Sequence, residues 1–88
     1  MTIMIKGWSD DAWNDYLYWQ NQGQKKIVKR INKIIKDIDR HPFEGLGKPE
    51  PLQYNLSGKW SRRINQEDRI IYMVDKETIY IYSCKDHY

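Results

Sequence analysis

The pattern of apolar and polar positions predicts two helices in the first half of the chain. The clearer one runs from about Gln24 to Arg40, where apolar residues recur at helical spacing and lysines fill the positions between them. Its apolar positions are Ile27, Val28, Ile31, Ile34, Ile35 and Ile38. This helix is expected to end near His41, because Pro42 disfavours helical conformation in the residue before it.

A shorter helix is expected before Gln24, on the N-terminal side of the helix just described. Ser9 can cap its N-terminus, with Asp10 and Asp11 in the first turn, where the helix dipole favours negative charge. Gly23 is a natural stop for this helix. Its inner stripe is predicted to consist of residues at i, i+3, i+4 and i+7, namely Trp13, Tyr16, Leu17 and Gln20.

Segments with strand character flank the two helices. Thr2–Trp8 is short and apolar and stops at a turn, and Phe43–Leu52 is punctuated by Gly and Pro and reads as a loop. Further strands are expected at Gln53–Leu56, Trp60–Asn65, Arg69–Asp75 and Thr78–Cys84. The short turns between the last three suit hairpins. The pattern therefore predicts an α+β fold, with an N-terminal strand and two helices packed on an antiparallel β-sheet.

Length and composition limit the kind of protein this can be. With 88 residues the chain is expected to form one domain over residues 1–88, whose core uses its four Trp, seven Tyr and many Ile. The lone Cys84 cannot form an intrachain disulfide, and the N-terminus lacks the pattern of a signal peptide. No apolar run approaches the roughly 20 residues that span a bilayer. These features predict a soluble, cytoplasmic protein with no membrane partner.

Positive charge is concentrated on one predicted element. The net charge is only +3, but residues 24–41 carry seven basic side chains against two acidic ones. Such a helix face can contact RNA phosphates, although a run of charge on a helix is more often only its solvated side. The charge distribution therefore leaves both interpretations open.

Several residues between the second helix and the C-terminus are candidates for chemistry. Glu50 stands between Pro49 and Pro51, which restrict the backbone on both sides, and a carboxylate held in this way suits a general base. The alternative is an exposed glutamate in a proline-rich turn, and Glu44 and Glu67 lie nearby as other carboxylates. The chain shows no metal-ligand spacing, P-loop or GxGxxG, so no metal or nucleotide cofactor is expected.

Three arginines can bind an anion near this carboxylate. Arg62, Arg63 and Arg69 lie around one predicted hairpin, and alternation along the strands allows Arg63 and Arg69 to converge on one phosphate. They can equally be solvated charges at a strand edge. Cys84 with His87 would suggest thiol catalysis, but Cys84 lies in an apolar strand and is interpreted as a small core residue.

Several blocks in order along the chain carry a family resemblance. They are NDYLYW (14–19), HPFEG (41–45), GKPEPL (47–52), NLSGKWSRRI (55–64), DRIIY (68–72) and the terminal HY (87–88). With these blocks the chain resembles the YoeB family of toxins, in the RelE-like superfamily, over essentially its whole length.

The resemblance implies a RelE-like toxin of a type II toxin-antitoxin system, acting as a ribosome-dependent endoribonuclease that cuts mRNA in the A site. It implies that Glu50, Arg69, His87 and Tyr88 are catalytic and that Arg63 assists phosphate binding. It also implies independence of metal, a homodimer, a YefM-like antitoxin, and contact with promoter DNA only through that antitoxin. Gln53 stands where a member of the family carries a lysine, and Lys48, Lys59 or the arginines are candidates to compensate.

These residues suggest a mechanism and two alternatives to it. Glu50 is expected to take the proton of the substrate's 2′-OH, Arg69 and Arg63 to stabilise the phosphorane, and His87 to protonate the 5′-oxygen. Arg62 and Lys48 are expected to bind substrate, and Tyr88 to position the phosphate or stack on a base. The alternatives are a non-catalytic module that binds the ribosome or nucleic acid, and a purely structural interaction domain.

Overall fold

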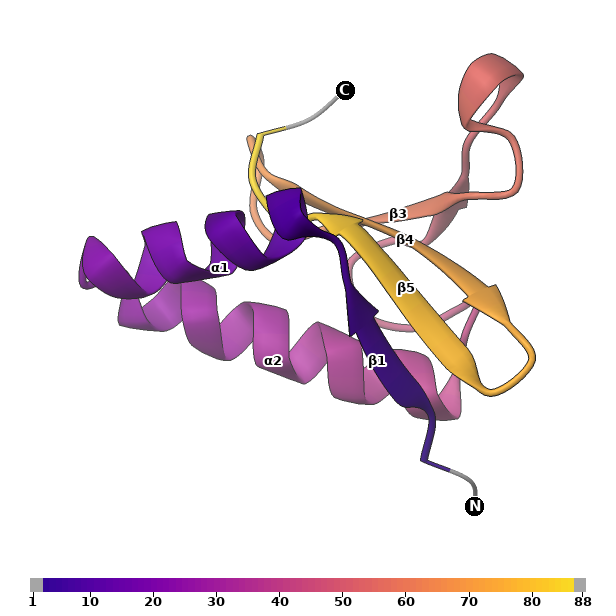
Figure 1. Cartoon of the computed structure of the whole chain (residues 1–88), viewed down its shortest axis with the longest axis horizontal. Coiled ribbons are helices and arrows are strands. Elements are labelled where there is room, and N and C mark those ends of the chain that lie inside the picture. The colour runs from indigo at the N-terminus through magenta and orange to yellow at the C-terminus, as the bar shows by residue number, and fades with distance from the viewer. Residues whose placement is uncertain (1–2, 87–88) are drawn as a thin grey trace.

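The protein folds as one five-stranded sheet with two helices against one of its faces, as a computed structural model of residues 3–86 shows (Figure 1). The strand order is β1-β5-β4-β3-β2. In chain order the elements are β1 (Ile5–Trp8), α1 (Asp10–Asn21), α2 (Lys25–Arg40), β2 (Glu50–Pro51), the 3₁₀ helix η1 (Tyr54–Leu56), β3 (Trp60–Arg63), β4 (Arg69–Asp75) and β5 (Thr78–Ser83). Within residues 3–86, neither helix has the length and hydropathy needed to cross a bilayer.

The sheet is mixed in direction. Strands β3, β4 and β5 form the expected antiparallel series, whereas β1 pairs in parallel with β5. The short strand β2, which pairs antiparallel with β3, lies in the segment that was expected to be only a loop. Parallel strands cannot be joined by a tight turn, and here the whole of the intervening chain makes the crossover. The α+β class is confirmed, and the N-terminal strand is part of the sheet at its edge.

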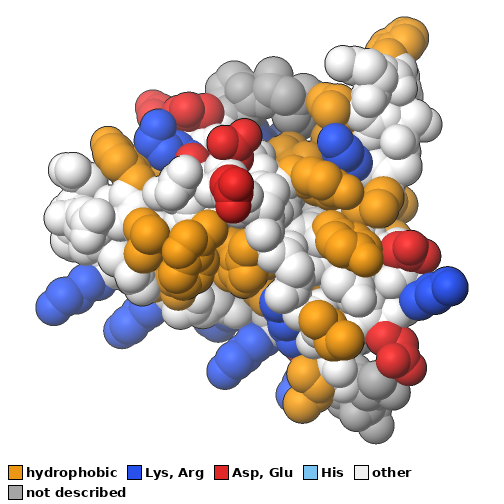
Figure 2. Space-filling view, viewed as in Figure 1, with side chains coloured by type: hydrophobic (Ala, Val, Ile, Leu, Met, Phe, Trp, Pro, Cys, Tyr) orange, Lys and Arg blue, Asp and Glu red, His pale blue; other side chains and the backbone are white. Residues whose placement is uncertain are grey.

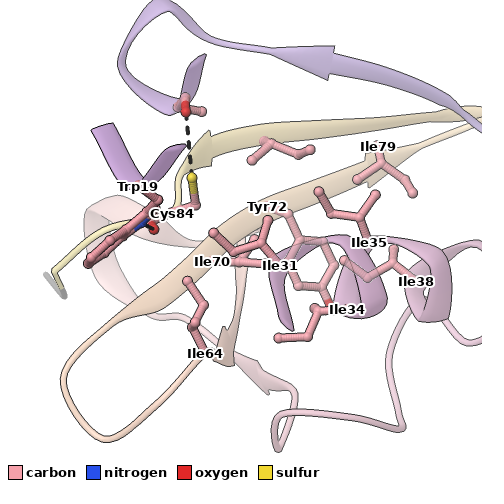
Figure 3. Close-up of a cluster of buried hydrophobic side chains, with 12 residues drawn as sticks. Trp19, Ile31, Ile34, Ile35, Ile38, Ile64, Ile70, Tyr72, Ile79 and Cys84 are labelled. Carbon is pink, nitrogen blue, oxygen red and sulfur yellow. Dashed lines mark hydrogen bonds between the residues drawn. The ribbon is translucent and has the colours of Figure 1, made fainter. Parts of the chain in front are cut away.

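Helix α2 buries the face that the apolar spacing predicts. Ile31, Ile34, Ile35 and Ile38 are all buried, and they pack against Ile70, Tyr72, Ile79 and Ile81 of the central strands (Figure 3). Full burial of one such side chain contributes about 1.5–3 kcal/mol. This cluster is therefore the main source of stability, and it fixes α2 on one face of the sheet.

Helix α1 begins as predicted but turns a different face to the core. The Ser9 hydroxyl caps it by accepting a hydrogen bond from the Ala12 amide at 3.0 Å. Ala12 and Trp19 are buried, whereas 47% of Trp13 is exposed, so the predicted stripe is wrong at Trp13 and Gln20. Tyr16, in the middle of that stripe, does pack against the core. Aromatic residues at several helical spacings fit more than one stripe. The indole of Trp19 selects this one, because its Nε1 donates to the Cys84 carbonyl at 2.8 Å.

The segment Gln53–Leu56 is not a strand, so that prediction is wrong. Its backbone turns at Tyr54, whose φ of 58° lies in the left-handed region, and the residues Tyr54–Leu56 form η1. Leu52 is buried at the base of this segment, and its amide donates to the Lys59 carbonyl at 2.9 Å. Residues 53–58 therefore form a projection that is closed at its base, with η1 at its tip (Figure 1).

Candidate functional site

Strand register brings Glu50, Arg63 and Arg69 to the same face of the sheet. Glu50 pairs with Ser61, and Arg63 pairs with Arg69, in the antiparallel ladders of β2, β3 and β4. Paired residues share a face, and so do residues two apart in one strand. This face lies opposite the helices, and we call it the open face. Figure 1 shows the projection of residues 53–58 and the segment 84–86 on the same side of the sheet, away from α2.

Arg63 and Arg69 face each other directly across β3 and β4. Like charges in opposed positions of a sheet destabilise it unless an anion lies between them. The Nη1 atom of Arg69 donates to the carbonyls of Asn65 at 2.8 Å and Asp68 at 3.1 Å, which orients its guanidinium. Among residues 3–86, the Arg63 side chain and the remaining donors of Arg69 have no partner. Within the described part of the chain, these arginines therefore have donors that a phosphate could engage.

Glu50 is exposed in the short strand β2, at a diagonal position to Arg63. Diagonal neighbours in a sheet lie about 7–8 Å apart, which long side chains can bridge. Glu50 also lines a hollow of about 560 Å³ formed by residues 50–56. Lys48 is exposed two residues earlier, with a left-handed φ of 51°. The carboxylate and its cationic neighbours thus lie within one region of the open face.

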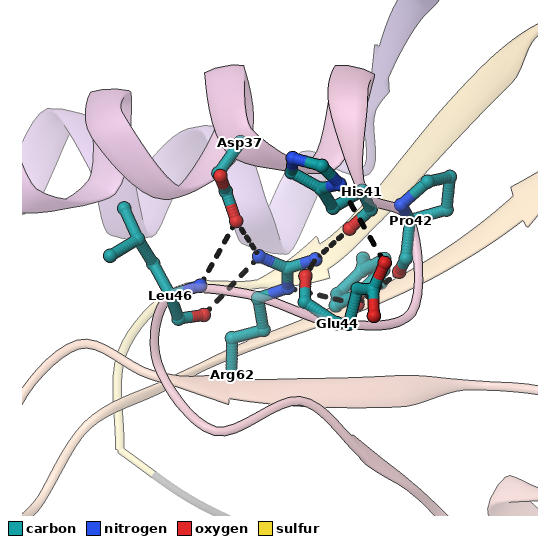
Figure 4. Close-up of polar contacts among 7 residues, drawn as sticks. Asp37, His41, Pro42, Glu44, Leu46 and Arg62 are labelled. Carbon is teal, nitrogen blue, oxygen red and sulfur yellow. Dashed lines mark hydrogen bonds and ion pairs between the residues drawn. The ribbon is translucent and has the colours of Figure 1, made fainter.

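Arg62 does not belong to this face, and the prediction that it binds substrate needs correction. Its side chain is fully buried on the helix side of the sheet, where its guanidinium meets Asp37 at 2.7 Å (Figure 4). All five guanidinium N–H donors have a partner, and none remains for RNA. The acceptors are Asp37, the Tyr72 hydroxyl, and the carbonyls of His41, Glu44 and Leu46.

The Arg62 cluster fixes the loop that leads to Glu50. It binds three carbonyls of residues 41–46, and the Asp37 carboxylate also accepts from the Leu46 amide at 3.0 Å. Burial favours the neutral acid, but the Leu46 amide and the Arg62 guanidinium outweigh it and lower the pKa of Asp37 below its ordinary value. The next residue, Gly47, accepts from the Arg63 amide at 2.6 Å. The loop that leads to Glu50 is therefore hydrogen-bonded to β3, the strand that carries Arg63.

The C-terminal segment is bound beside Arg69. The Asp86 carbonyl accepts from the Arg69 amide at 2.9 Å, and the Asp86 amide donates to the Asp68 carboxylate at 2.6 Å. Sequence reasoning missed Asp68, because nothing in its spacing relates it to residue 86. The predicted catalytic residues His87 and Tyr88 lie outside the described residues, and Asp86 is the last residue before them.

Cys84 is a core residue, as interpreted from the sequence. It is fully buried, and its thiol donates to the Ala12 carbonyl at 3.5 Å. Burial, with the nearby charges of Asp15 and Asp68, raises the pKa of this thiol to about 12. Thiolate chemistry near neutral pH is therefore excluded at this position. Across residues 3–86, His, Cys, Asp and Glu side chains form no group of three able to hold a metal ion.

Helix α2 carries the second cationic region on its outer surface, which we call the basic face. Its exposed members are Lys25, Lys26, Lys29, Lys33, Lys36 and Arg40. Figure 2 shows Lys and Arg side chains projecting along the part of the surface where Figure 1 places α2. The two acidic residues of the helix are engaged elsewhere, because Asp37 pairs with Arg62 and Asp39 with Lys6 at 2.6 Å.

Comparison with known proteins gives consistent results. A family model described as the YoeB-like toxin of bacterial type II toxin-antitoxin systems matches residues 8–88. Toxin YoeB of Escherichia coli O6:H1 is 58% identical over 81 residues, which cover 92% of this chain and 95% of that toxin.

Two solved structures from Staphylococcus aureus are also close to this fold. One is described as a YoeB dimer; it has a TM-score of 0.90 and 50% identity, and the match covers 99% of this chain and all of that one. The other is a YoeB-YefM complex with a TM-score of 0.88 and 51% identity over 97% of this chain and 98% of that one.

Proposed function

Because the chain belongs to the YoeB-like toxins of bacterial type II toxin-antitoxin systems, we propose that it is an endoribonuclease that enters the ribosomal A site and cuts mRNA there. One observation carries the proposal. The open face presents the carboxylate of Glu50 and the opposed guanidinium groups of Arg63 and Arg69 on three neighbouring strands. A carboxylate beside free arginine donors suits transfer at a phosphate.

The reaction begins with the substrate's own 2′-OH. Glu50 takes its proton while O2′ forms a bond to phosphorus, and Arg63 and Arg69 donate to the oxygens on which negative charge develops. The bond from phosphorus to O5′ then breaks, and His87 gives its proton to that leaving oxygen. An imidazole with an unperturbed pKa of about 6.5 is protonated in a useful fraction near neutral pH. The products are a 2′,3′-cyclic phosphate and a 5′-hydroxyl.

The roles of His87 and Tyr88 are supported by the residue that precedes them. Asp86, the last described residue, accepts a hydrogen bond from the Arg69 amide at 2.9 Å. Tyr88 is proposed to position the phosphate or to stack on a base. Lys48, exposed near Glu50, is proposed as a further substrate contact.

Two protein partners belong to the proposal. Relatives with about half of their residues identical to this chain have been solved as a dimer and as a complex with YefM. We propose that this chain likewise forms a homodimer and is silenced by a YefM-like antitoxin, through which alone it meets promoter DNA.

The test of this function is primer extension on mRNA in a reconstituted translation system. Glu50→Ala is expected to cut at least about 10²-fold more slowly, since a general base contributes 10²–10⁴-fold. Glu77→Ala is the matched control, because Glu77 is exposed in the turn between β4 and β5. Products that carry 5′-phosphate ends, or cleavage by Glu50→Ala at the wild-type rate, would contradict the mechanism.

The basic face of α2 supports a second candidate function. Its exposed lysines have no acidic partner within residues 3–86, as expected of a surface that meets phosphates. A non-catalytic module that binds the ribosome through this face would arrest translation and leave the mRNA intact. The same primer-extension experiment separates the two functions, because only the nuclease creates new RNA ends.

A further inference from the structure

Tyr54 is held in an exposed and strained position at the tip of the projection. The residue is 90% exposed, the largest value for a large hydrophobic residue within residues 3–86. Its φ of 58° is rare for a bulky aromatic residue, and such a conformation is strained. Among residues 3–86 its ring stacks on no other ring and its hydroxyl makes no hydrogen bond. The core therefore gains nothing from this tyrosine.

The projection holds this residue firmly. The Ser57 amide donates to the Tyr54 carbonyl at 3.0 Å, and the Leu56 amide donates to the Gln53 carbonyl at 3.1 Å. At the base of the projection Leu52 is buried, and Lys59 lies over the Tyr82 ring at 4.2 Å. An aromatic ring on an ordered support is displayed at a low entropic cost, which is what a contact surface requires.

The position of Tyr54 relates it to the proposed site. Tyr54 and Glu50 line the same hollow of about 560 Å³, which lies within the roughly 300–1,000 Å³ of ligand sites. The projection rises on the same side of the sheet as residues 84–86, away from α2 (Figure 1). A ligand whose phosphate lies at Arg63 and Arg69 would extend a neighbouring group toward Tyr54.

We propose that Tyr54 is a stacking platform for one nucleobase of the mRNA, next to the phosphate that is cut. This inference rests on the proposed function of the open face. Single-stranded RNA offers an aromatic face at every nucleotide, and stacking on a protein ring is the usual way to hold an unpaired base. The neighbouring cations favour RNA over a protein partner, since Arg63 shares the open face with Glu50, and Lys48 is exposed two residues before Glu50. Tyr54 then contributes to substrate affinity and base preference without taking part in the chemistry.

The binding test uses mRNA that the proposed reaction cannot cut. The A-site codon carries 2′-O-methyl groups, and 2-aminopurine replaces each base in turn, because its fluorescence falls when it stacks. With wild-type protein on programmed ribosomes, fluorescence is expected to fall at one position. Tyr54→Trp retains this quenching, and Tyr54→Asn abolishes it. Asn55→Ala, in the same loop, is the control that leaves the ring in place.

Cleavage of unmodified mRNA gives the second readout. Tyr54→Asn is expected to lower kcat/KM about 5- to 100-fold, mainly through KM, as the loss of one base stack implies. Its melting temperature should equal or exceed that of wild type, because asparagine adopts positive φ more readily than tyrosine. This separates loss of the ring from loss of the fold.

Other results would overturn the stacking proposal. It is wrong if Tyr54→Asn quenches like wild type, if wild type quenches no position, or if the variant weakens only binding to an antitoxin. Failure of the proposed function gives a different result. The wild-type protein would then leave unmodified mRNA uncut, whether or not it quenches the fluorescence of methylated mRNA.

Discussion

At the scale of single residues, Arg62 and Arg63 show how one step along a strand decides the role of a side chain. Successive residues of β3 point to opposite faces of the sheet. Arg62 therefore enters the layer between sheet and helix, where Asp37 and three carbonyls surround it. Arg63 points to the open face and stays exposed. The same residue type supports the fold at one position and offers binding groups at the next.

This contrast predicts different effects of the same substitution. Arg62→Met should lower the free energy of unfolding by about 3–5 kcal/mol, because it leaves Asp37 and several carbonyls buried without their cation. Arg63→Met should change stability by no more than about 0.5 kcal/mol, as is usual on a surface, yet impair cleavage. Urea unfolding and primer extension on both variants test this. Equal stability of the two variants would contradict the role given to the cluster.

Two aspartates predict opposite dependences of stability on pH. The lowered pKa of Asp37 means that its contribution is present above the unfolded-state pKa of about 3.9 and is lost as pH falls through the folded value. Burial raises the pKa of Asp15, although the Cys84 amide opposes the shift. Its contribution is therefore present below the unfolded-state pKa and is lost as pH rises through the folded value.

The measurement is the free energy of unfolding of three proteins at pH 7 and pH 3. For each protein, the free energy of unfolding at pH 3 is subtracted from that at pH 7. This difference should be more positive in Asp15→Asn than in wild type, and less positive in Asp37→Asn than in wild type. Shifts of the same sign in both variants would show that one assignment is wrong.

At the scale of elements, the loop between α2 and β2 sets the position of Glu50. Gly47 has a φ of 81°, and a Cβ there would lie 2.9 Å from the Arg63 carbonyl, so the loop passes against β3 at this point. Gly58, in the turn before β3, also has a positive φ of 92°, but a Cβ there would meet nothing within 4 Å. Both glycines thus have a left-handed backbone, but only Gly47 lies too close to another strand to accommodate a Cβ atom.

Gly47→Ala and Gly58→Ala separate these two effects. Both should lose about 1 kcal/mol from the left-handed backbone. Gly47→Ala should lose a further 1–3 kcal/mol or so, because the added methyl group pushes the loop off β3. It should also cut mRNA more slowly, since Glu50 moves with the loop. Urea unfolding and primer extension give both quantities, and identical losses in the two variants would contradict the close approach at Gly47.

The elements differ in how far the sequence determined them. Helix α2 follows from one apolar stripe and needs no further information. In α1 the aromatic residues allow two stripes, and only the hydrogen bond from Trp19 to Cys84 selects the inner one. Gln53–Leu56 has the composition of a strand, but the left-handed backbone of Tyr54 ends any ladder there. The local sequence pattern does not predict the structure where a contact with a distant residue, or the φ angle of a single residue, determines it.

At the scale of the whole molecule, the sheet separates two cationic regions. Arg63 and Arg69 lie on the open face, whereas the basic face belongs to α2, which covers the opposite side. If the proposed function is correct, this arrangement suits contact with mRNA through the open face and with ribosomal RNA through the basic face.

The separation predicts that recruitment and cleavage can be weakened independently. Changing Lys29, Lys33 and Lys36 to Gln should weaken ribosome binding. It should also make the slope of log binding constant against log salt concentration shallower, by roughly 0.7–0.9 for each phosphate that is no longer neutralised. Cleavage at saturating protein should be unchanged. Binding titrations at several salt concentrations test this. A slope equal to that of wild type would show that the basic face is only the solvated side of α2.

The candidate site was predictable in part. Alternation along two strands is enough to pair Arg63 with Arg69, and the flanking prolines single out Glu50. The inward direction of Arg62 was not predictable, because the sequence does not tell which face of β3 the helices cover. The bond from Asp86 to Asp68 joins residues 18 apart through one backbone amide, and no pattern marks such a contact.

The strand order also has a consequence for how the protein is made. Strand β5 is the second-last part of the chain to be synthesised, yet it lies between β1 and β4 and supplies Ile79, Ile81 and then Cys84 to the core. Until it emerges, β1 has no neighbour in the sheet and α1 lacks the carbonyl that holds Trp19. The first strand and the first helix therefore cannot reach their native packing until β5, the last strand of the sheet in chain order, has been synthesised.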